Sequence, residues 1–175
     1  MPHIMTVDDD PNIRALLSAI ISSLGYEVTG AESGEAALNE IKTKQFDLVL
    51  LDHHMAGMSG IDTAKALNQQ HVPFVYCTSV TEDEVLRHAM AQGALNYIVK
   101  PFTPAKVIFA IASSLGRIEE KEQNNLTQIA TGILMERNQM TREDAHQQLK
   151  ANATASDTSM DISASALINA LQPRQ

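Results

Sequence analysis

The sequence has few of the residues on which several common kinds of site depend. It contains one cysteine, Cys77, no tryptophan and only 4% aromatic residues among 175. A single cysteine excludes an internal disulfide and fits a reducing cytoplasm. No apolar run approaches the roughly 20 residues needed to span a bilayer, and a net charge of −8 disfavours non-specific binding to DNA or to a membrane. We therefore expect a cytoplasmic protein with neither DNA nor a membrane among its partners.

Short apolar runs alternate with helical patterns up to about residue 116. The runs that we expect to form strands are His3–Val7, Tyr26–Gly30, Phe46–Leu51, Pro73–Cys77 and Asn96–Val99. Three of them have little polar interruption, which suits strands buried on both faces of a parallel sheet. The pattern predicts an α/β fold, a doubly wound five-stranded parallel sheet of the flavodoxin-like order 2-1-3-4-5 with a helix after each strand.

Helix-start signals support this alternation. They are Asp10 before Pro11, a capping box of Thr81 and Glu84, and Thr103 before Pro104. The helix after Thr103 has no clear end, because apolar and polar residues spaced by threes and fours continue to Ile129 as in a coiled-coil seam. The alternative is a helix that ends near Gly116, followed by a solvated linker at Glu119–Asn125.

The remainder of the chain, residues 126–175, has an all-helical pattern. Thr141 predicts a helix start, with Asp144 three positions later. The polar stretch Asn152–Asp161 is expected to be a loop or a frayed helix end, and Pro173 is expected to stop a last helix. These features predict a long helix followed by a small three-helix all-α domain.

Charged residues gather at the predicted carboxyl ends of three strands. Asp8 and Asp9 follow the first strand, Asp52 follows the third, and Lys100 follows the fifth. Ligands of open α/β sheets bind beyond these strand ends. Three clustered carboxylates repel one another, so the site needs a cation, and oxygen-only ligation favours Mg²⁺. Asp52 can then act as a nucleophile towards a phosphoryl group, on which Lys100 places a positive charge.

Other residues near this edge allow several interpretations. Thr78, at the end of the fourth strand, can donate a hydroxyl hydrogen bond to the phosphoryl group. The aspartates can also be explained as helix caps alone. His53 and His54 suggest a metal pair, but the chain has no partners at zinc spacing. Cys77 lies within an apolar strand, which predicts an inert buried thiol.

Residues 3–116 resemble the receiver domain of two-component response regulators. The matching segments, in chain order, are Val7–Pro11, Leu50–Met55, Gly57–Gly60, Thr78–Ser79 and Tyr97–Phe102. The resemblance covers about two thirds of the chain. One departure is Ala56, which stands where the family usually has proline and is expected to loosen the loop after Asp52.

This resemblance implies a specific signalling chemistry. Asp52 would accept a phosphoryl group from a sensor histidine kinase, without enzyme activity beyond this self-catalysed transfer. Mg²⁺ would be held by Asp8 or Asp9, by Asp52 and by the main-chain carbonyl of His54. The resemblance also implies that two further residues, Thr78 and Tyr97, form a switch pair that changes one face of the domain.

The C-terminal part resembles a second family, the ANTAR domains of antiterminator regulators. The matching segments are Ile129–Arg137, Met140–Ala145 and Leu149. This resemblance implies binding to stem-loops of leader RNA, transcription antitermination, and a homodimer formed through the linking helix. We therefore expect a receiver domain at residues 1–116, a helical linker or coiled coil at 117–125, and an ANTAR-like output domain at 126–175.

Composition gives RNA binding only partial support. From residue 117 onward there are six Lys/Arg and eight Asp/Glu, and no aromatic residue follows Phe109, so neither phosphate neutralisation nor base stacking is favoured. The candidate RNA contacts are Arg137, Arg142 and Lys150. Two alternatives stay open. The output domain can bind a protein or only dimerise, or the chain can be a phosphorelay carrier that passes the phosphoryl group from Asp52 to a histidine phosphotransferase.

Overall fold

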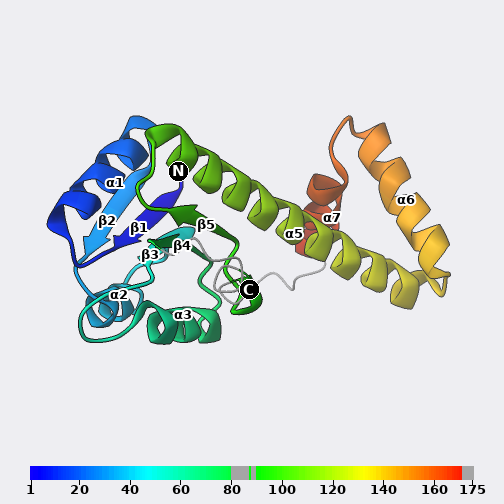
Figure 1. Cartoon of the computed structure of the whole chain (residues 1–175). Coiled ribbons are helices and arrows are strands. Elements are labelled where there is room, and N and C mark those ends of the chain that lie inside the picture. Colours follow the sequence, from blue (N-terminus) through cyan, green and yellow to red (C-terminus); the bar gives the residue numbers. More distant parts are fainter. Residues whose placement is uncertain (80–86, 88–89, 171–175) are drawn as a thin grey trace. The chain divides into compact units, whose positions relative to one another are not determined.

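The chain folds into two compact units, which divide between Gly116 and Arg117. The computed structural model describes residues 1–79, 87 and 90–170 (Figure 1). The capping box expected at Thr81 and Glu84 lies outside the described residues, as does Pro173. No helix in the described part of the chain is long and apolar enough to cross a membrane.

The first unit is built around a five-stranded parallel sheet. Its strands are β1 (His3–Val7), β2 (Glu27–Ala31), β3 (Leu48–Asp52), β4 (Phe74–Thr78) and β5 (Asn96–Val99). Their order, β2-β1-β3-β4-β5, confirms the predicted fold class. The two central strands β3 and β4 are buried along their whole length, which explains why their sequences are almost continuously apolar.

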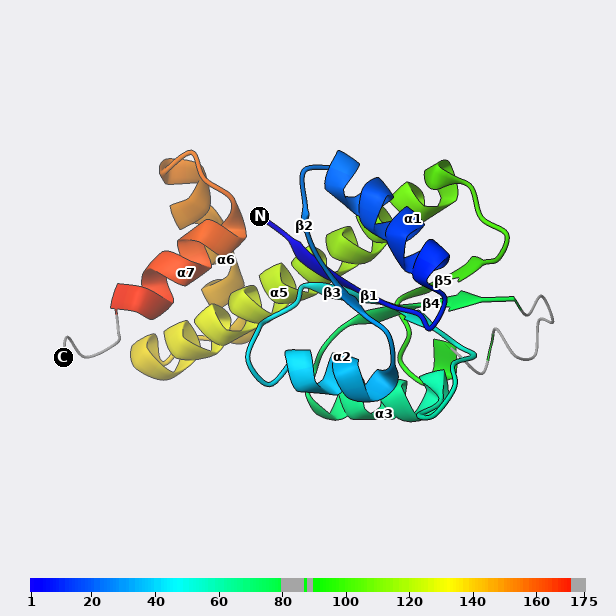
Figure 2. The same cartoon turned by 90° about the vertical axis from the view of Figure 1, so that its left-hand side faces the viewer.

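Helices cover both faces of this sheet. Helix α1 (Pro11–Ser23) and the first part of α5 (Pro104–Asn138) lie on one face, whereas α2 (Gly34–Glu40) and α3 (Gly60–Gln69) lie on the other (Figures 1 and 2). Buried side chains of the sheet pack against α2 and α3 in one apolar cluster. This layering leaves the carboxyl ends of the strands at one edge.

Local capping explains where the helices begin. Asp10 caps α1 by accepting a hydrogen bond from the amide of Asn12, and Pro11 occupies the first turn, as the sequence predicts. Ser33 and Ser59 cap α2 and α3 in the same way. Asp10 follows Asp8 and Asp9 in the short segment between β1 and α1. Its capping interaction therefore helps to fix the backbone at these two aspartates.

Helix α5 is continuous from Pro104 to Asn138. The alternative of a helix that ends near Gly116 is therefore wrong. A glycine in a helix interior costs only about 1 kcal/mol relative to alanine, and the residues after it, from Arg117 to Asn125, include several good helix formers. The whole stretch at residues 117–125 is helical, and all of it except Ile118 is exposed.

The second unit consists of the later part of α5 with α6 (Arg142–Ala155) and α7 (Met160–Ala170). One cluster of buried residues in its core consists of Ala130, Leu134, Ala145, Leu149 and Ala164, and Ala153 is buried as well. Thr141 caps α6 and hydrogen-bonds the amide and carboxylate of Asp144. Of the stretch Asn152–Asp161, which was expected to be a loop or a frayed helix end, residues 152–155 end α6, residues 160–161 begin α7, and only residues 156–159 lie outside the helices.

Candidate functional site

Three carboxylates meet at the carboxyl end of the sheet. Asp8 and Asp9 lie just beyond β1, and Asp52 is the last residue of the neighbouring strand β3. One carboxylate oxygen from each residue lies within 4.8 Å of the other two. Asp8 and Asp52 are buried and Asp9 is exposed, so the cluster has a closed side and an open side. The sequence-based prediction of an acidic cluster at this edge is thus consistent with the geometry.

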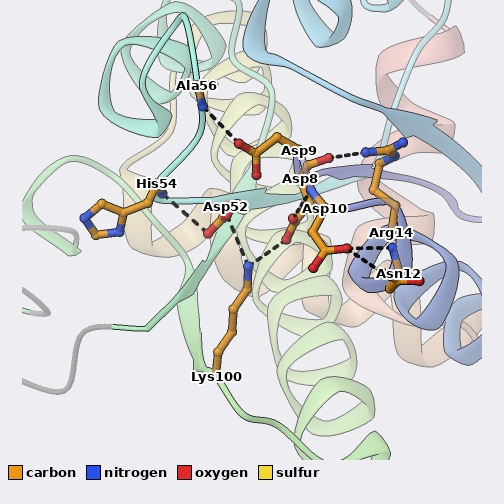
Figure 3. A network of polar contacts seen from close by, with 9 residues as sticks. All are labelled: Asp8, Asp9, Asp10, Asn12, Arg14, Asp52, His54, Ala56 and Lys100. Carbon is orange, nitrogen blue, oxygen red and sulfur yellow. Dashed lines mark hydrogen bonds and ion pairs between the residues drawn. The ribbon is translucent and has the colours of Figure 1, made fainter.

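Lys100 lies between the two buried carboxylates. Its Nζ is 2.7 Å from Asp8 Oδ2 and 3.1 Å from Asp52 Oδ2 (Figure 3). The lysine follows β5 directly, and its amide donates to the main-chain oxygen of Thr78 on β4 (2.7 Å). The end of the sheet therefore positions the ammonium group.

The charges of neighbouring groups in the cluster, together with burial, alter the pKa values of Asp52 and Lys100. Burial raises the pKa of the Asp52 carboxyl above its ordinary value, against the attraction of Lys100, and repulsion by Asp8 adds to the increase. Burial alone would lower the pKa of Lys100, but its hydrogen bond to Asp8 and the charges of Asp52 and Asp8 outweigh burial and raise it. Lys100 therefore stays protonated, while the charge on Asp52 is only partly compensated.

The cluster fits a hard divalent cation. Three carboxylates and one ammonium group leave an excess of negative charge, and all the side-chain donors are oxygen atoms. Mg²⁺ prefers such ligands and is commonly bound by only one or two carboxylates. A cation here would favour the ionised form of Asp52. The amide of His54 lies 3.4 Å from Asp52 Oδ1, which places this residue beside the cluster.

Further groups at the site were missed by sequence reasoning. Arg14 Nη1 donates to the main-chain oxygen of Asp8 (2.6 Å), and the amide of Ala56 donates to Asp9 Oδ2 (3.0 Å) (Figure 3). The sequence could have indicated Arg14, since it lies one turn into the helix that starts at the strand end. It could not have indicated Ala56, because the contact is made by a main-chain amide, which every residue except proline has. Ala56 was expected to loosen its loop, but its N–H, which a proline would lack, adds a contact.

The loop after Asp52 is also held from its far end. The amide of Met58 donates to Glu35 Oε1 on α2 (3.1 Å). Gly57 adopts a positive φ of 79°, which suits glycine. Gly60 packs so closely that an added Cβ would lie 2.2 Å from the main-chain oxygen of Asp52. Glycine is thus required where α3 begins.

The two residues of the expected switch pair occupy different environments. Thr78 is the last residue of β4 and is buried. Tyr97 lies on β5, opposite Tyr76 in the strand register, and its side chain is 39% exposed. The hydroxyl-bearing Thr78 is therefore buried at the edge of the site, whereas Tyr97 is exposed on the neighbouring strand.

The minor candidates have structural explanations. Cys77 is buried, as predicted, and burial raises the pKa of its thiol to about 12, which favours an unreactive thiol. The Nδ1 atoms of His53 and His54 lie 3.2 Å apart. Burial, and then the neighbouring His54, lower the pKa of His53. No third metal ligand joins this pair among the groups found in the described residues.

The candidate RNA contacts lie in the second unit. Arg137 is in the last turn of α5, Arg142 is the first residue of α6, and Lys150 lies two turns further along α6. All three side chains are exposed. Glu143 and Asp144 follow Arg142 directly, so the start of α6 is also acidic.

Comparison with known proteins identifies the first unit. The response regulator receiver domain family matches residues 4–112. The DNA-binding response regulator MtrA of Mycolicibacterium smegmatis is 31% identical over 126 residues, which cover 71% of this chain and 55% of MtrA. The response regulator SaeR of Staphylococcus aureus is 29% identical over 132 residues, covering 74% of this chain and 58% of SaeR. The chain thus spans little more than half the length of these relatives.

Solved structures agree with this family. The chemotaxis protein CheY4 of Vibrio cholerae superimposes with a TM-score of 0.61 and 31% identity, covering 64% of this chain and 97% of CheY4. The match includes nearly all of a protein whose size is that of the first unit. With its sheet order, its acidic edge and a family match over more than half its length, this chain belongs to the response regulator receiver domain family.

Proposed function

We propose that this chain is a response regulator in which Asp52 accepts a phosphoryl group from a sensor histidine kinase. The observation that carries the proposal is the position of Lys100 between Asp8 and Asp52, with Asp9 on the open side of the cluster. Ligands of open α/β sheets bind at this end of the strands, so an ammonium group between two buried carboxylates, with a third carboxylate beside them, favours a functional site over a purely structural ion pair. The receiver family supports the same assignment.

The proposed chemistry uses groups already in place. An Asp52 oxygen attacks the phosphorus of a phosphohistidine, a new P–O bond forms, and the P–N bond breaks as the imidazole leaves and takes up a proton. Lys100 contacts the phosphoryl oxygens, and the hydroxyl of Thr78 donates to them. Asp8, Asp9, Asp52 and the main-chain carbonyl of His54 would hold Mg²⁺, which would supply positive charge against the carboxylates and the phosphoryl group.

The signal then passes through Thr78 and Tyr97. A phosphoryl group on Asp52 attracts the Thr78 hydroxyl, and the exposed Tyr97 ring turns inward, which changes the surface at β5 and α5. The burial of Thr78 and the exposure of Tyr97 in this structure match the starting state of such a switch.

Labelling with a small phosphodonor tests the acceptor. Wild-type protein incubated with radioactive acetyl phosphate and Mg²⁺ is expected to incorporate one phosphoryl group, and D52N none. D10N is the matched control, because it changes a neighbouring aspartate while asparagine keeps the helix cap. Equal labelling of wild type and D52N would disprove the assignment.

The proposed output is RNA binding by the helical unit. We assign the receiver domain to residues 1–116, the helical linker to residues 117–125 and the ANTAR-like output domain to residues 126–175. Arg137, Arg142 and Lys150 contact leader RNA stem-loops and so affect transcription antitermination. The exposed stretch of α5 at residues 117–125 joins two copies into a homodimer. Support comes from the resemblance of Ile129–Arg137 to ANTAR domains and from the exposure of the three cations.

A gel shift with leader RNA, with and without beryllofluoride, tests this output. The triple variant R137A/R142A/K150A is expected to lose binding, whereas K42A/K44A/K65A, which removes three cations of the first unit, is expected to retain it. MtrA is described as DNA-binding, so duplex DNA of the same length is the competitor. Tighter binding to DNA, or equal negligible binding to RNA in both states, would rule out the RNA output.

Two other outputs predict different results. A protein-interaction or dimerisation unit would give a stoichiometric protein complex that survives nuclease treatment. A phosphorelay carrier would lose its label rapidly to a histidine phosphotransferase without a change of oligomeric state. Measurement of solution mass with and without beryllofluoride also tests whether phosphorylation drives dimer formation.

A further inference from the structure

The loop that follows Asp52 is joined to Asp9 by a single main-chain donor. The amide of Ala56 donates to Asp9 Oδ2 at 3.0 Å, and the two residues are 47 positions apart in the chain (Figure 3). This hydrogen bond connects the segment after β1 with the segment after β3. Both segments contribute to the acidic cluster, Asp9 from one and Asp52 with His54 from the other.

The donor is held in place by its neighbours rather than by its own methyl side chain. Two residues further on, the Met58 amide donates to Glu35. Gly57, at a φ of 79°, lies between these two donating residues and lets the chain turn from one carboxylate to the other. At the end of the loop, Gly60 packs against the main chain of Asp52. The Ala56 N–H is therefore presented to Asp9 by a loop whose following residues are fixed.

The side chain of Asp9 is less restrained by its surroundings than those of Asp8 and Asp52. Asp8 and Asp52 are buried and both contact Lys100, whereas Asp9 is exposed. An exposed carboxylate is free to sample several rotamers, and ordering it costs side-chain entropy when it binds a ligand. A hydrogen bond to a fixed amide removes part of that cost in advance and holds the open side of the cluster near the other two oxygens.

We propose that the main-chain amide of Ala56 is a positioning group, which orients Asp9 and so strengthens divalent-cation binding at the acidic cluster. The inference rests on the proposed function, because it assigns Asp9 to the cation. It deepens that function by giving a role to a main-chain atom of the loop.

A proline substitution tests the amide directly, because proline has no N–H. Binding of Mn²⁺, used as the probe, is followed by electron paramagnetic resonance of the free ion, so no phosphorylation is needed. A56P is expected to weaken binding at least tenfold, roughly the effect of losing one hydrogen bond to a charged group. A56G, which keeps the N–H, is the matched control and is expected to stay within about twofold of wild type. Equal affinities of A56P and A56G would overturn the proposal.

Two further measurements separate this mechanism from simple damage to the loop. In the D9A background, A56P is expected to cause no additional loss of Mn²⁺ affinity, and an additional loss as large as in wild type would contradict the proposal. Amide hydrogen exchange by NMR needs no proline variant, and Ala56 is expected to exchange faster in D9A than in wild type. If wild type binds no Mn²⁺, the proposed function itself fails. If it binds and the A56P and D9A results do not match these expectations, only the positioning role fails.

Discussion

Cys77 on β4 lies directly opposite Asp52 on β3 in the strand register. A thiol and a candidate phosphoryl acceptor therefore share the same buried environment, and burial raises the pKa of both groups. The Asp52 and Cys77 side chains differ in their other contacts. Lys100 contacts the Asp52 carboxylate at 3.1 Å, while the Cys77 residue is 1% exposed within the core.

Cys77 should be unreactive in the folded protein. With a pKa of about 12 instead of the ordinary 9.0, the thiolate fraction at pH 8 falls by about a thousandfold, and burial also blocks access. Ellman's reagent is expected to detect no thiol in native protein at pH 8 and one thiol per chain in guanidinium. Stoichiometric reaction of the native protein within minutes would contradict the burial of this strand.

D52N should stabilise the protein at neutral pH in the absence of divalent cations. Because the pKa of Asp52 is raised in the folded state, the folded protein binds this proton more tightly than the unfolded chain does. That contribution to stability is complete below the ordinary pKa of 3.8 and is lost as the pH rises through the raised value. At pH 7 with EDTA, urea unfolding is expected to show a gain of about 1 kcal/mol for D52N.

The pH dependence provides the control for D52N. Between about pH 4 and pH 7 the free energy of unfolding should change less in D52N than in wild type, whereas D10N should follow the wild-type curve more closely. A lower stability of D52N at pH 7 would show that the attraction of Lys100 outweighs burial at this position.

Alanine substitutions of two glycines should have opposite effects. At Gly60 an added Cβ would lie 2.2 Å from the main-chain oxygen of Asp52 and 2.8 Å from the His53 Cα, so G60A is expected to cost about 2–3 kcal/mol. At Gly116 nothing lies within 4 Å, and G116A is expected to add up to about 1 kcal/mol of helix stability. Urea unfolding followed by circular dichroism measures both, and similar losses in the two variants would be the unexpected result.

Thr141 should stabilise the start of α6 through its hydroxyl. It accepts a hydrogen bond from the Asp144 amide (3.2 Å) and donates to the Asp144 carboxylate (2.6 Å). T141A is expected to cost about 1 kcal/mol, and T141S, which keeps the hydroxyl, should cost little. Amide hydrogen exchange across Arg142–Ala155 is the measurement. Unchanged protection in T141A would mean that packing of Ala145 and Leu149 alone holds this helix.

Local and periodic signals account for the parts of the fold that could be predicted. The apolar runs predicted the five strands, although three of them begin and end one or two residues from the predicted bounds, and Asp10 with Pro11 predicted the start of α1. The acidic cluster could be predicted because carboxyl ends of neighbouring parallel strands share an edge. The sequence could not decide whether α5 ends at Gly116, since one glycine alters helix stability too little to outweigh its surroundings.

What could not be predicted comes from main-chain groups and long-range packing. The Ala56 amide and the Gly60 contact depend on loop conformation, which the residue types do not encode directly. For Asn152–Asp161 the sequence left open a loop or a frayed helix end, because Ser, Thr, Asp and Asn favour turns locally. Packing of Ala153 and Ala164 in the core of the second unit instead extends the helices on both sides.

Lys100 pairs with Asp8, 92 positions earlier in the chain, and with Asp52, which also precedes it, and this order has a consequence for biosynthesis. Asp8 and Asp52 emerge from the ribosome before Lys100 does, and at ordinary elongation rates Lys100 follows Asp52 by roughly 2–10 s. During that interval the nascent sheet has two like charges to bury without their shared ammonium group. The last strand to emerge is therefore the one that neutralises this end of the domain, and a chain truncated before it lacks that neutralising charge.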